Sequence, residues 1–486
     1  MKLAQLIQAI EPKQVLGSTN IEITGIQFDS RKVEPGNLFV AQTGTTMDGH
    51  TFIDACIEKG ASAVVCERTD AIHTANATTI IVVDNSDKAL GLMANEWFGQ
   101  PSRHLTLVGV TGTNGKTTIA TLLYKMVRAM GKKAGLLSTV INYVDADAVP
   151  STHTTPDALA LNELLSQMVQ AGCEYAFMEV SSHSIAQERI AGLDFDGALF
   201  TNLTRDHIDY HKTFDNYRDT KKRLFDSLKK TAFAISNKDD KNGLVMLQNC
   251  KAELHTYSTR SLADYKASIL EEGFDGMLLS INGQEVFVPL VGRFNTSNIL
   301  AIYGAAICLG FESAEVLRIL STLTAVNGRF EAIHSPKGWT AIVDYAHTPD
   351  AVDNVIRTIN EIRKRGSKLI TVVGCGGNRD KGKRPMMAQI AKRGSDCLIL
   401  TSDNPRDEQP QDILQDMAAG LTEEELRETL IIEDRASAIQ TACVMAQADD
   451  VILVAGKGHE DYQIIKGVKH HFDDHEVIRR FVQNNN

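Results

Sequence analysis

The chain has 486 residues, which allows roughly three domains of about 150 residues each. Its 61 Asp and Glu residues outnumber 50 Lys and Arg residues, and the net charge of −11 argues against bulk electrostatic binding of nucleic acid. No apolar run approaches the roughly 18–20 residues of a membrane span, and the eight cysteines are scattered without a CxxC pair, so we expect a cytoplasmic protein with reduced thiols.

The first predicted domain covers residues 1–100. Apolar runs predict strands at 38–41, 63–66 and 80–83. The segment 51–59 between them has a helical pattern that Gly60 would end. The segment Gln100-Pro101-Ser102 is typical of a linker to the next domain.

The second predicted domain covers residues 101–334. It opens with a buried strand at 104–111, followed by a glycine-containing loop and a helix at about 117–130. Further core strands are predicted at 175–180 and 198–203, and residues 251–290 have the pattern of short strands joined by turns.

The third predicted domain covers residues 335–486, after a linker at 335–338. Apolar runs predict strands at 341–343, 369–373, 397–401, 430–432 and 451–454. Helical stretches lie between them, which indicates an open, mostly parallel sheet. Ligands of such sheets bind at the carboxyl ends of the strands.

A phosphate-binding loop is predicted between the first strand and helix of the second domain, at Val110–Thr118. Gly112 and Gly115 would let backbone N–H groups close on phosphate oxygens, and the helix N-terminus adds a favourable dipole. Lys116 would reach the phosphates, and the Thr117 hydroxyl would hold Mg²⁺. The usual motif has glycine where this chain has Val110. Kinases, motors, switches and ligases all use such loops, so the motif names no reaction.

Two further segments carry metal-type ligands. Glu179 lies near the end of an apolar strand, where a second Mg²⁺ ligand belongs, but a solvated strand end is an equally good explanation. Residues 201–211 follow another apolar strand and concentrate two aspartates and two histidines, including His207, without specifying a metal.

Lys221 lies within an otherwise apolar helical stripe that includes Phe214, Tyr217 and Leu224. The pattern favours a lysine whose head reaches water. The alternative is a functional lysine at the edge of a site, because desolvation lowers the pKa of an amine and makes it reactive.

Seven features recur in the order known from the Mur ligases: GTNGKTT, MEVSSH, TNLTRDHIDYH, the spacing from Tyr217 to Lys221, GRFNTSN, NGRFE and DYAHTPD. The chain resembles this family over nearly its whole length. The family consists of ATP-dependent amide-forming enzymes of peptidoglycan precursor synthesis, and so of cell-wall biogenesis, cell shape and cell division. We therefore predict an α/β protein of three domains, with a central parallel sheet of the P-loop ATPase type and a C-terminal Rossmann-like sheet.

Other motifs resemble the MurE branch of the family: FDSR, TGTTMDGH, THTTPD, GCGGNRDKGKRP, SDNPRDEQP and GKGHEDYQ. Members of this branch that add meso-diaminopimelate carry Asp-Asn-Pro-Arg, here residues 403–406, whereas lysine-adding members typically lack the Arg. Meso-diaminopimelate differs from lysine by a distal carboxylate, which a guanidinium fork can bind through two hydrogen bonds. Without this context Asn-Pro would be a plain turn followed by an exposed Arg406.

The resemblance also assigns residues to ligands. The UDP-sugar would contact Phe28, Ser30, Thr45, Thr46 and Met47. The muramoyl-dipeptide would contact His153, where relatives commonly have Asn, and Thr154, Thr155, Ser181, Gln187 and Arg189. ATP would contact Gly112, Thr113, Asn114, Gly115, Lys116, Thr117, Thr118, Asn295, Arg329 and His347. The amino acid would contact Arg379, Asp403, Asn404, Pro405, Arg406, Gly456 and Glu460.

The expected catalytic residues are Lys116, Glu179, His207 and Lys221. In the family the lysine at position 221 reacts with CO₂, and the resulting carbamate would help Thr117, Glu179 and His207 to hold Mg²⁺.

The predicted reaction joins meso-diaminopimelate to UDP-N-acetylmuramoyl-L-Ala-D-Glu through an acyl phosphate, in a monomer without nucleic-acid or membrane partners. The alternatives are a lysine-adding or folylpolyglutamate-type ligase and, from another class, a P-loop switch or motor.

Overall fold

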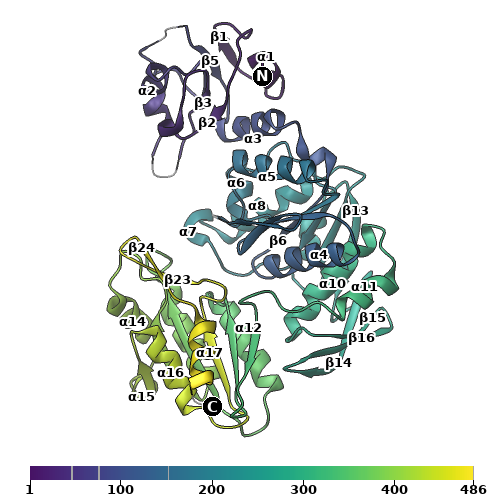
Figure 1. The fold of residues 1–486 in the computed structure, drawn as a ribbon, viewed down its shortest axis with the longest axis vertical. Helices are drawn as coiled ribbons and strands as arrows, with labels where there is room; N and C mark the ends of the chain where they lie inside the picture. The colour runs from purple at the N-terminus through teal and green to yellow at the C-terminus, as the bar shows by residue number, and fades with distance from the viewer. Residues whose placement is uncertain (45–46, 75–76, 152, 485–486) are drawn as a thin grey trace.

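The computed structural model describes residues 1–44, 47–74, 77–151 and 153–484. Its strands form three large sheets, one in each part of the chain, and these sheets follow one another along the long axis of the molecule (Figure 1). The predicted α/β class with three sheet-based domains is confirmed.

The N-terminal sheet has five strands in the order β1-β5-β4-β3-β2. The strands are β1 Gln14–Leu16, β2 Ile26–Gln27, β3 Leu38–Val40, β4 Ala63–Cys66 and β5 Thr79–Val82, and the helices are α1 Leu3–Gln8, α2 Ile53–Glu58 and α3 Ser86–Trp97. All but β1 run parallel. Helix α3 packs against helix α5 of the central domain (Ala158–Gln170), so it joins the two domains (Figure 1).

The central sheet has eleven strands in the order β16-β15-β14-β13-β12-β11-β6-β10-β7-β8-β9. The strands are β6 Thr106–Thr111, β7 Ala134–Leu137, β8 Ile141–Val144, β9 Asp147–Pro150, β10 Tyr175–Glu179, β11 Gly197–Phe200, β12 Phe233–Asn237, β13 Glu253–Ser258, β14 Tyr265–Gly273, β15 Gly276–Ile281 and β16 Gln284–Val288. The helices are α4 Lys116–Ala129, α5 Ala158–Gln170, α6 Ser182–Ala186, α7 Ile208–His211, α8 Phe214–Asp226, α9 Gly243–Leu247, α10 Arg293–Cys308 and α11 Ser313–Leu320.

Apolar residues on both faces explain why the middle of this sheet is parallel and covered by helices. Along β6, Leu107 belongs to one hydrophobic cluster and Val108 to the other, because successive side chains of a strand point to opposite faces. Helices α4 and α10 bury their apolar side chains on one face, and α5 and α8 cover the other. The short strands predicted within 251–290 are β13–β16, and β14–β16 form an antiparallel extension.

The C-terminal sheet has the order β17-β18-β22-β19-β20-β21, with a separate β23–β24 hairpin. The strands are β17 Glu331–His334, β18 Thr340–Asp344, β19 Leu369–Cys375, β20 Cys397–Ser402, β21 Thr429–Ile431, β22 Val451–Ala455, β23 Tyr462–Ile465 and β24 Val468–His471. The helices are α12 Pro349–Ile362, α13 Lys383–Gly394, α14 Pro410–Ala418, α15 Glu423–Arg427, α16 Arg435–Met445 and α17 Asp474–Asn484.

The five strands predicted for this sheet are present and parallel. The sheet also contains β17, which lies before the predicted domain start at residue 335. β17 pairs antiparallel with β18 across the turn at 335–338, so the segment predicted as a linker is a hairpin turn. Its strand was missed because the residues are only partly buried and form no apolar run.

Within the described residues no helix is long and apolar enough to cross a membrane. All eight cysteines are free thiols, as the scattered spacing predicts.

Candidate active site

The phosphate-binding loop joins β6 to α4, as the sequence predicts. Gly112 has a φ of 148° and Gly115 a φ of 88°, and a Cβ at Gly112 would lie 1.9 Å from the Thr201 hydroxyl oxygen. Glycine is therefore required at both positions. The Lys116 ammonium donates to the carbonyl oxygens of Gly112 and Thr113 at 3.0 and 2.8 Å, so it lies over the loop. Burial lowers the pKa of Lys116.

Val110, which replaces the usual first glycine, is a fully buried residue of β6 and lies opposite Glu179 of β10 in the parallel register. Because β6 lies between β10 and β11, their carboxyl ends meet at one edge of the sheet. Glu179 is buried there, and its carboxylate accepts a hydrogen bond from the Thr139 backbone N–H at 2.7 Å. Glu179 is therefore a fixed residue beside the loop and not a solvated strand end.

Lys221 is 1% exposed, so the interpretation that its head reaches water is wrong. Its ammonium donates to the Gly112 carbonyl oxygen at 2.8 Å and lies 4.8 Å from the ring centroid of Tyr217. Tyr217 in turn contacts the Thr113 hydroxyl at 3.1 Å. Burial and the nearby Lys116 lower the pKa of Lys221 well below its usual range. The fold thus places an easily deprotonated amine against the phosphate-binding loop.

The segment after β11 brings several titratable groups next to the loop. His207 has a φ of 54° and pairs with Asp206 at 3.3 Å. Its ring lies 4.7 Å from that of His183, and His211 contacts the Ser182 hydroxyl at 2.9 Å. Burial and neighbouring cations lower the pKa of His207 to about 4, so its imidazole is neutral at physiological pH.

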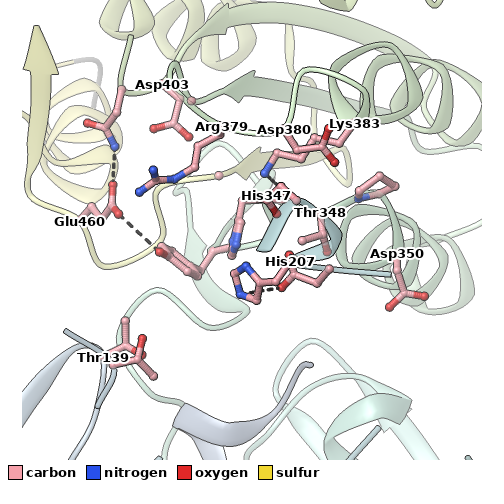
Figure 2. Close-up of a pocket in the computed structure, with 18 of the residues that line it drawn as sticks. Thr139, His207, His347, Thr348, Asp350, Arg379, Asp380, Lys383, Asp403 and Glu460 are labelled. Carbon is pink, nitrogen blue, oxygen red and sulfur yellow. Dashed lines mark hydrogen bonds and ion pairs between the residues drawn. The ribbon is translucent and has the colours of Figure 1, made fainter. Parts of the chain in front are cut away.

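A cavity of about 820 Å³ lies between the central and C-terminal domains. Figure 2 shows Thr139 on one side, Arg379, Asp403 and Glu460 on the other, and His207 between them. His207 and His347 therefore share one space with residues predicted for the amino-acid pocket, although long stretches of sequence separate them.

The end of this cavity that contains Asp403 and Glu460 is built from the segments after β20 and β22. Asn404 donates to the Glu460 carboxylate at 2.7 Å, and the fully buried Lys457 ammonium lies 3.4 Å from the same carboxylate and 3.9 Å from that of Asp403. Burial and the charge of Asp403 raise the pKa of Glu460. Gly456 has a φ of 119°, and a Cβ there would lie 2.9 Å from the Asp403 carboxylate.

Two guanidinium groups lie beside these carboxylates. Arg406 follows the buried Pro405 with a φ of 53°, and its side chain donates to the Gly377 carbonyl oxygen at 2.8 Å. Arg379 lines the same cavity, and burial and the charge of Arg406 lower its pKa. The Arg406 side chain is thus turned toward the pocket and is not the exposed arginine of a plain turn.

A second cavity of about 240 Å³ begins at the phosphate-binding loop. Its lining includes Asn114, Gly115, Thr118, Asn298, Arg329 and His347. Arg329 donates to the Thr117 hydroxyl at 3.1 Å, and burial lowers the pKa of His347 to about 4. Asn295 lies behind the lining and accepts a hydrogen bond from Asn298 at 2.9 Å.

The residues predicted to contact the muramoyl-dipeptide lie between this region and α3. His153 and Thr154 line the large cavity, while the Thr155 hydroxyl donates to the Glu179 carbonyl oxygen at 2.8 Å. Ser181 caps α6. Arg189 contacts the carbonyl oxygen of Thr155 and the side chain of Gln187.

The residues predicted for the UDP-sugar lie in the N-terminal domain. Phe28 and Ser30 are partly buried, Met47 is 65% exposed, and Thr45 and Thr46 fall outside the described residues. Over the described ranges, no N-terminal residue lines either cavity.

The protein matches three family models, which together cover most of its length. They are described as Mur ligase family, catalytic domain, over 22–97, as Mur ligase middle domain over 110–306, and as Mur ligase, glutamate ligase domain, over 328–458. Among named relatives, a UDP-N-acetylmuramoyl-L-alanyl-D-glutamate–2,6-diaminopimelate ligase of Phocaeicola vulgatus is 60% identical, with 100% of both chains covered. The enzyme of the same name from Clostridium tetani is 40% identical over 99% of both chains.

The chain belongs to the Mur ligase family. A solved structure of a UDP-N-acetylmuramoyl-L-alanyl-D-glutamate–2,6-diaminopimelate ligase superposes with a TM-score of 0.69 at 34% identity, covering 100% of this chain and 99% of that one. MurF from Acinetobacter baumannii shares the fold at a TM-score of 0.63, with 16% identity over 99% and 98% of the two chains.

Several residues that line the large cavity of this Mur ligase were not among the predicted site residues. They include Thr139, Asp206, Tyr345 and Lys383. Lys457 was also missed; it does not line the cavity but lies 3.9 Å from the Asp403 carboxylate. Asp206 lies in the motif TNLTRDHIDYH and Lys383 in GCGGNRDKGKRP, so membership of these motifs could have marked both as site residues. Thr139 follows β7 in a segment without a recognisable motif, and only the pairing of β7 with β10 places it beside Glu179.

Proposed function

We propose that the protein uses ATP to join meso-diaminopimelate to UDP-N-acetylmuramoyl-L-Ala-D-Glu, as a cytoplasmic step of peptidoglycan precursor synthesis. The observation that carries this proposal is the shared cavity, in which the segments that follow β7 and β11 face a pocket containing Arg406. The names of the full-length relatives support the same reaction.

ATP would bind with its phosphates on the loop 112–118 and its nucleoside in the second cavity. Backbone N–H groups at the start of α4 suit the phosphates. Arg329 at the Thr117 hydroxyl and Lys116 over the loop supply two cations for the phosphates. In the first step the γ-carboxylate of the D-glutamyl residue attacks the γ-phosphorus, and ADP leaves. Two anions meet there, so these cations lower the barrier most in this step.

The residues around the loop fit Mg²⁺ by their chemistry. No described group of three or more His, Cys, Asp or Glu side chains is arranged as a complete metal site. Mg²⁺ does not require one, because it is usually bound by one or two carboxylates together with waters and substrate phosphates. Thr117, the buried Glu179 and His207 would hold it, and it would neutralise phosphate charge.

Lys221 fits carbamylation because its amine is buried and has a lowered pKa, and because it is held by the Gly112 carbonyl oxygen and the Tyr217 ring. A neutral amine can react with CO₂, and the resulting anion would lie beside the loop. The carbamate would add a carboxylate-type ligand to Glu179 and His207.

In the second step the amine at the L-centre of diaminopimelate attacks the acyl phosphate, and the tetrahedral intermediate collapses to an amide and phosphate. The amine must be neutral to attack. Asp403 and Glu460 would bind the other ammonium group, and Arg406 with Arg379 would bind the distal carboxylate. Lysine has the same distal ammonium group but no distal carboxylate, so both guanidinium groups would stay unpaired, which disfavours the lysine-adding alternative.

The UDP-sugar would be held by the N-terminal domain, near Phe28, Ser30 and Met47, with its peptide passing Arg189 to the cavity. Because these sites lie in different domains, we expect the domains to move together around the bound substrates. A single chain carries the whole set of expected residues, which supports a functional monomer.

The test is phosphate release from ATP with UDP-N-acetylmuramoyl-L-Ala-D-Glu and either meso-diaminopimelate or L-lysine. We expect release only with the first amine. Release with lysine alone would overturn the assignment of the pocket, and release without any acceptor would favour a nucleotide switch.

A further inference from the structure

Arg384 is a fully buried arginine in the first turn of α13, and it does not line either cavity. Its guanidinium makes two hydrogen bonds to the Glu408 carboxylate, both at 2.9 Å. It also donates to the Asp416 carboxylate at 2.7 Å and to the Gly376 carbonyl oxygen at 3.2 Å. A planar, bidentate arrangement of this kind fixes both position and orientation.

The partners of Arg384 belong to the two loops that carry the predicted specificity residues. Gly376 opens the loop that contains Arg379, and Glu408 lies two residues after Arg406. The Glu408 carboxylate also accepts a hydrogen bond from the Asn378 backbone N–H at 2.5 Å. Arg384 and Glu408 therefore fasten both loops to α13 from behind the pocket.

Direct contacts continue this connection toward the pocket. The Gly377 N–H donates to the Asn404 carbonyl oxygen at 2.9 Å, and a Cβ at Gly377 would lie 1.9 Å from the Pro405 carbonyl oxygen. The two loops thus touch through their backbones. A small shift of one loop against the other would change the distance between the guanidinium groups of Arg379 and Arg406.

Holding these two cations together is unfavourable before a dicarboxylate binds, because like charges repel. The ion pair behind the loops opposes this repulsion. The hydrogen bonds from Arg384 lower the pKa of Glu408 to about 2, so the pair remains charged throughout the physiological range.

We propose that Arg384, acting through Glu408, is a positioning residue that fixes the spacing of Arg379 and Arg406 and thereby sets the preference for an amino acid with a distal carboxylate. The inference rests on the proposed function, since it concerns the same pocket. Arg384 would not touch the substrate.

The test compares wild type, Arg384→Lys and Glu408→Gln. Lysine keeps the charge of residue 384 but cannot make the bidentate bond, and glutamine keeps the shape of residue 408 but not its charge. Arg393→Lys is the matched control, because Arg393 is an exposed residue of the same helix. For each protein we would measure the melting temperature, KM for ATP, for the UDP-dipeptide and for meso-diaminopimelate, and the ratio of kcat/KM for meso-diaminopimelate over L-lysine.

We expect KM for meso-diaminopimelate to rise about ten- to a hundredfold in both variants, as misplacement of a binding group does. The ratio over lysine should fall by a similar factor. The KM values for ATP and the UDP-dipeptide should stay within about twofold, because Arg384 and Glu408 are not bonded to the described residues assigned to those sites. Arg393→Lys should match wild type.

An unchanged ratio in a folded Arg384→Lys or Glu408→Gln protein would overturn the inference. A uniform loss of activity with all three KM values unchanged would also overturn it, since that result describes a merely structural residue. If Arg384→Lys does not fold, Glu408→Gln decides. Wild type without a preference for meso-diaminopimelate would instead refute the proposed function.

Discussion

Replacing Lys221 with methionine should separate activity from stability. Methionine has a similar length and no charge, so it can fill the space of the lysine stem. The Gly112 carbonyl oxygen loses one donor but keeps the other, the Lys116 ammonium at 3.0 Å. The substitution therefore leaves no buried acceptor without a partner.

The expected change in stability is small. The variant loses a hydrogen bond worth about 1 kcal/mol and a cation–ring contact worth about 0.5–2 kcal/mol. Burying an amine costs about 1–3 kcal/mol in protein interiors, and the variant avoids this cost. The two sides cancel to within about 1 kcal/mol, and the melting temperature should move by less than about 3 °C.

The expected change in activity is large. Without an amine at residue 221 no carbamate can form to help hold the metal ion. The stabilisation of phosphate charge by a bound metal ion is worth several kcal/mol in phosphoryl transfer. We expect kcat to fall by at least about a hundredfold, equal to about 2.7 kcal/mol.

The assay is phosphate release with both substrates, with and without added bicarbonate, together with thermal unfolding. Wild type should respond to bicarbonate and Lys221→Met should not. Lys230→Met, at an exposed lysine just after α8, is the control and should behave as wild type. Retained activity in Lys221→Met, or a melting temperature lower by more than about 5 °C, would refute the reasoning.

Three further results are expected. Arg406→Met should lower kcat/KM for meso-diaminopimelate by about a hundredfold or more and leave the activity with lysine unchanged or higher, because two charge-assisted hydrogen bonds are lost; equal losses for both amines would contradict this. Asp474→Asn should destabilise the C-terminal domain by about 3–5 kcal/mol in denaturant unfolding, because the fully buried Arg435 loses the carboxylate that it binds at 2.8 Å and is left as an unpaired charge. Burial lowers the pKa of His475, but its ion pairs with Glu331 and Asp473 outweigh burial and raise it above 6.5. His475→Gln should therefore be less stable than wild type below pH 6.5, and the difference should shrink as the pH rises through the raised pKa; a constant difference would refute the ion-pair explanation.

The sequence by itself determined the parts that depend on local pattern. The apolar runs that became β6, β10 and β19 are buried on both faces, so their composition alone marks them as interior parallel strands. Gly112 and Gly115 lie where only glycine fits, so the loop could be recognised from the spacing of its residues. The ordered motifs then indicated the family, because each motif preserves such a local requirement.

Only the tertiary structure decided which residues meet. Lys221 has the pattern of a lysine that reaches water, and it is buried because α8 packs its apolar face onto the sheet beside the Gly112 carbonyl oxygen. Strand β17 carries no apolar run, and its pairing with β18 assigns it to the third sheet. The carboxylates that bind Arg384 lie outside its own helix, because Glu408 and Asp416 follow it by 24 and 32 residues. Contacts between residues far apart in sequence arise from sheet order and domain packing, which no local pattern of residues encodes.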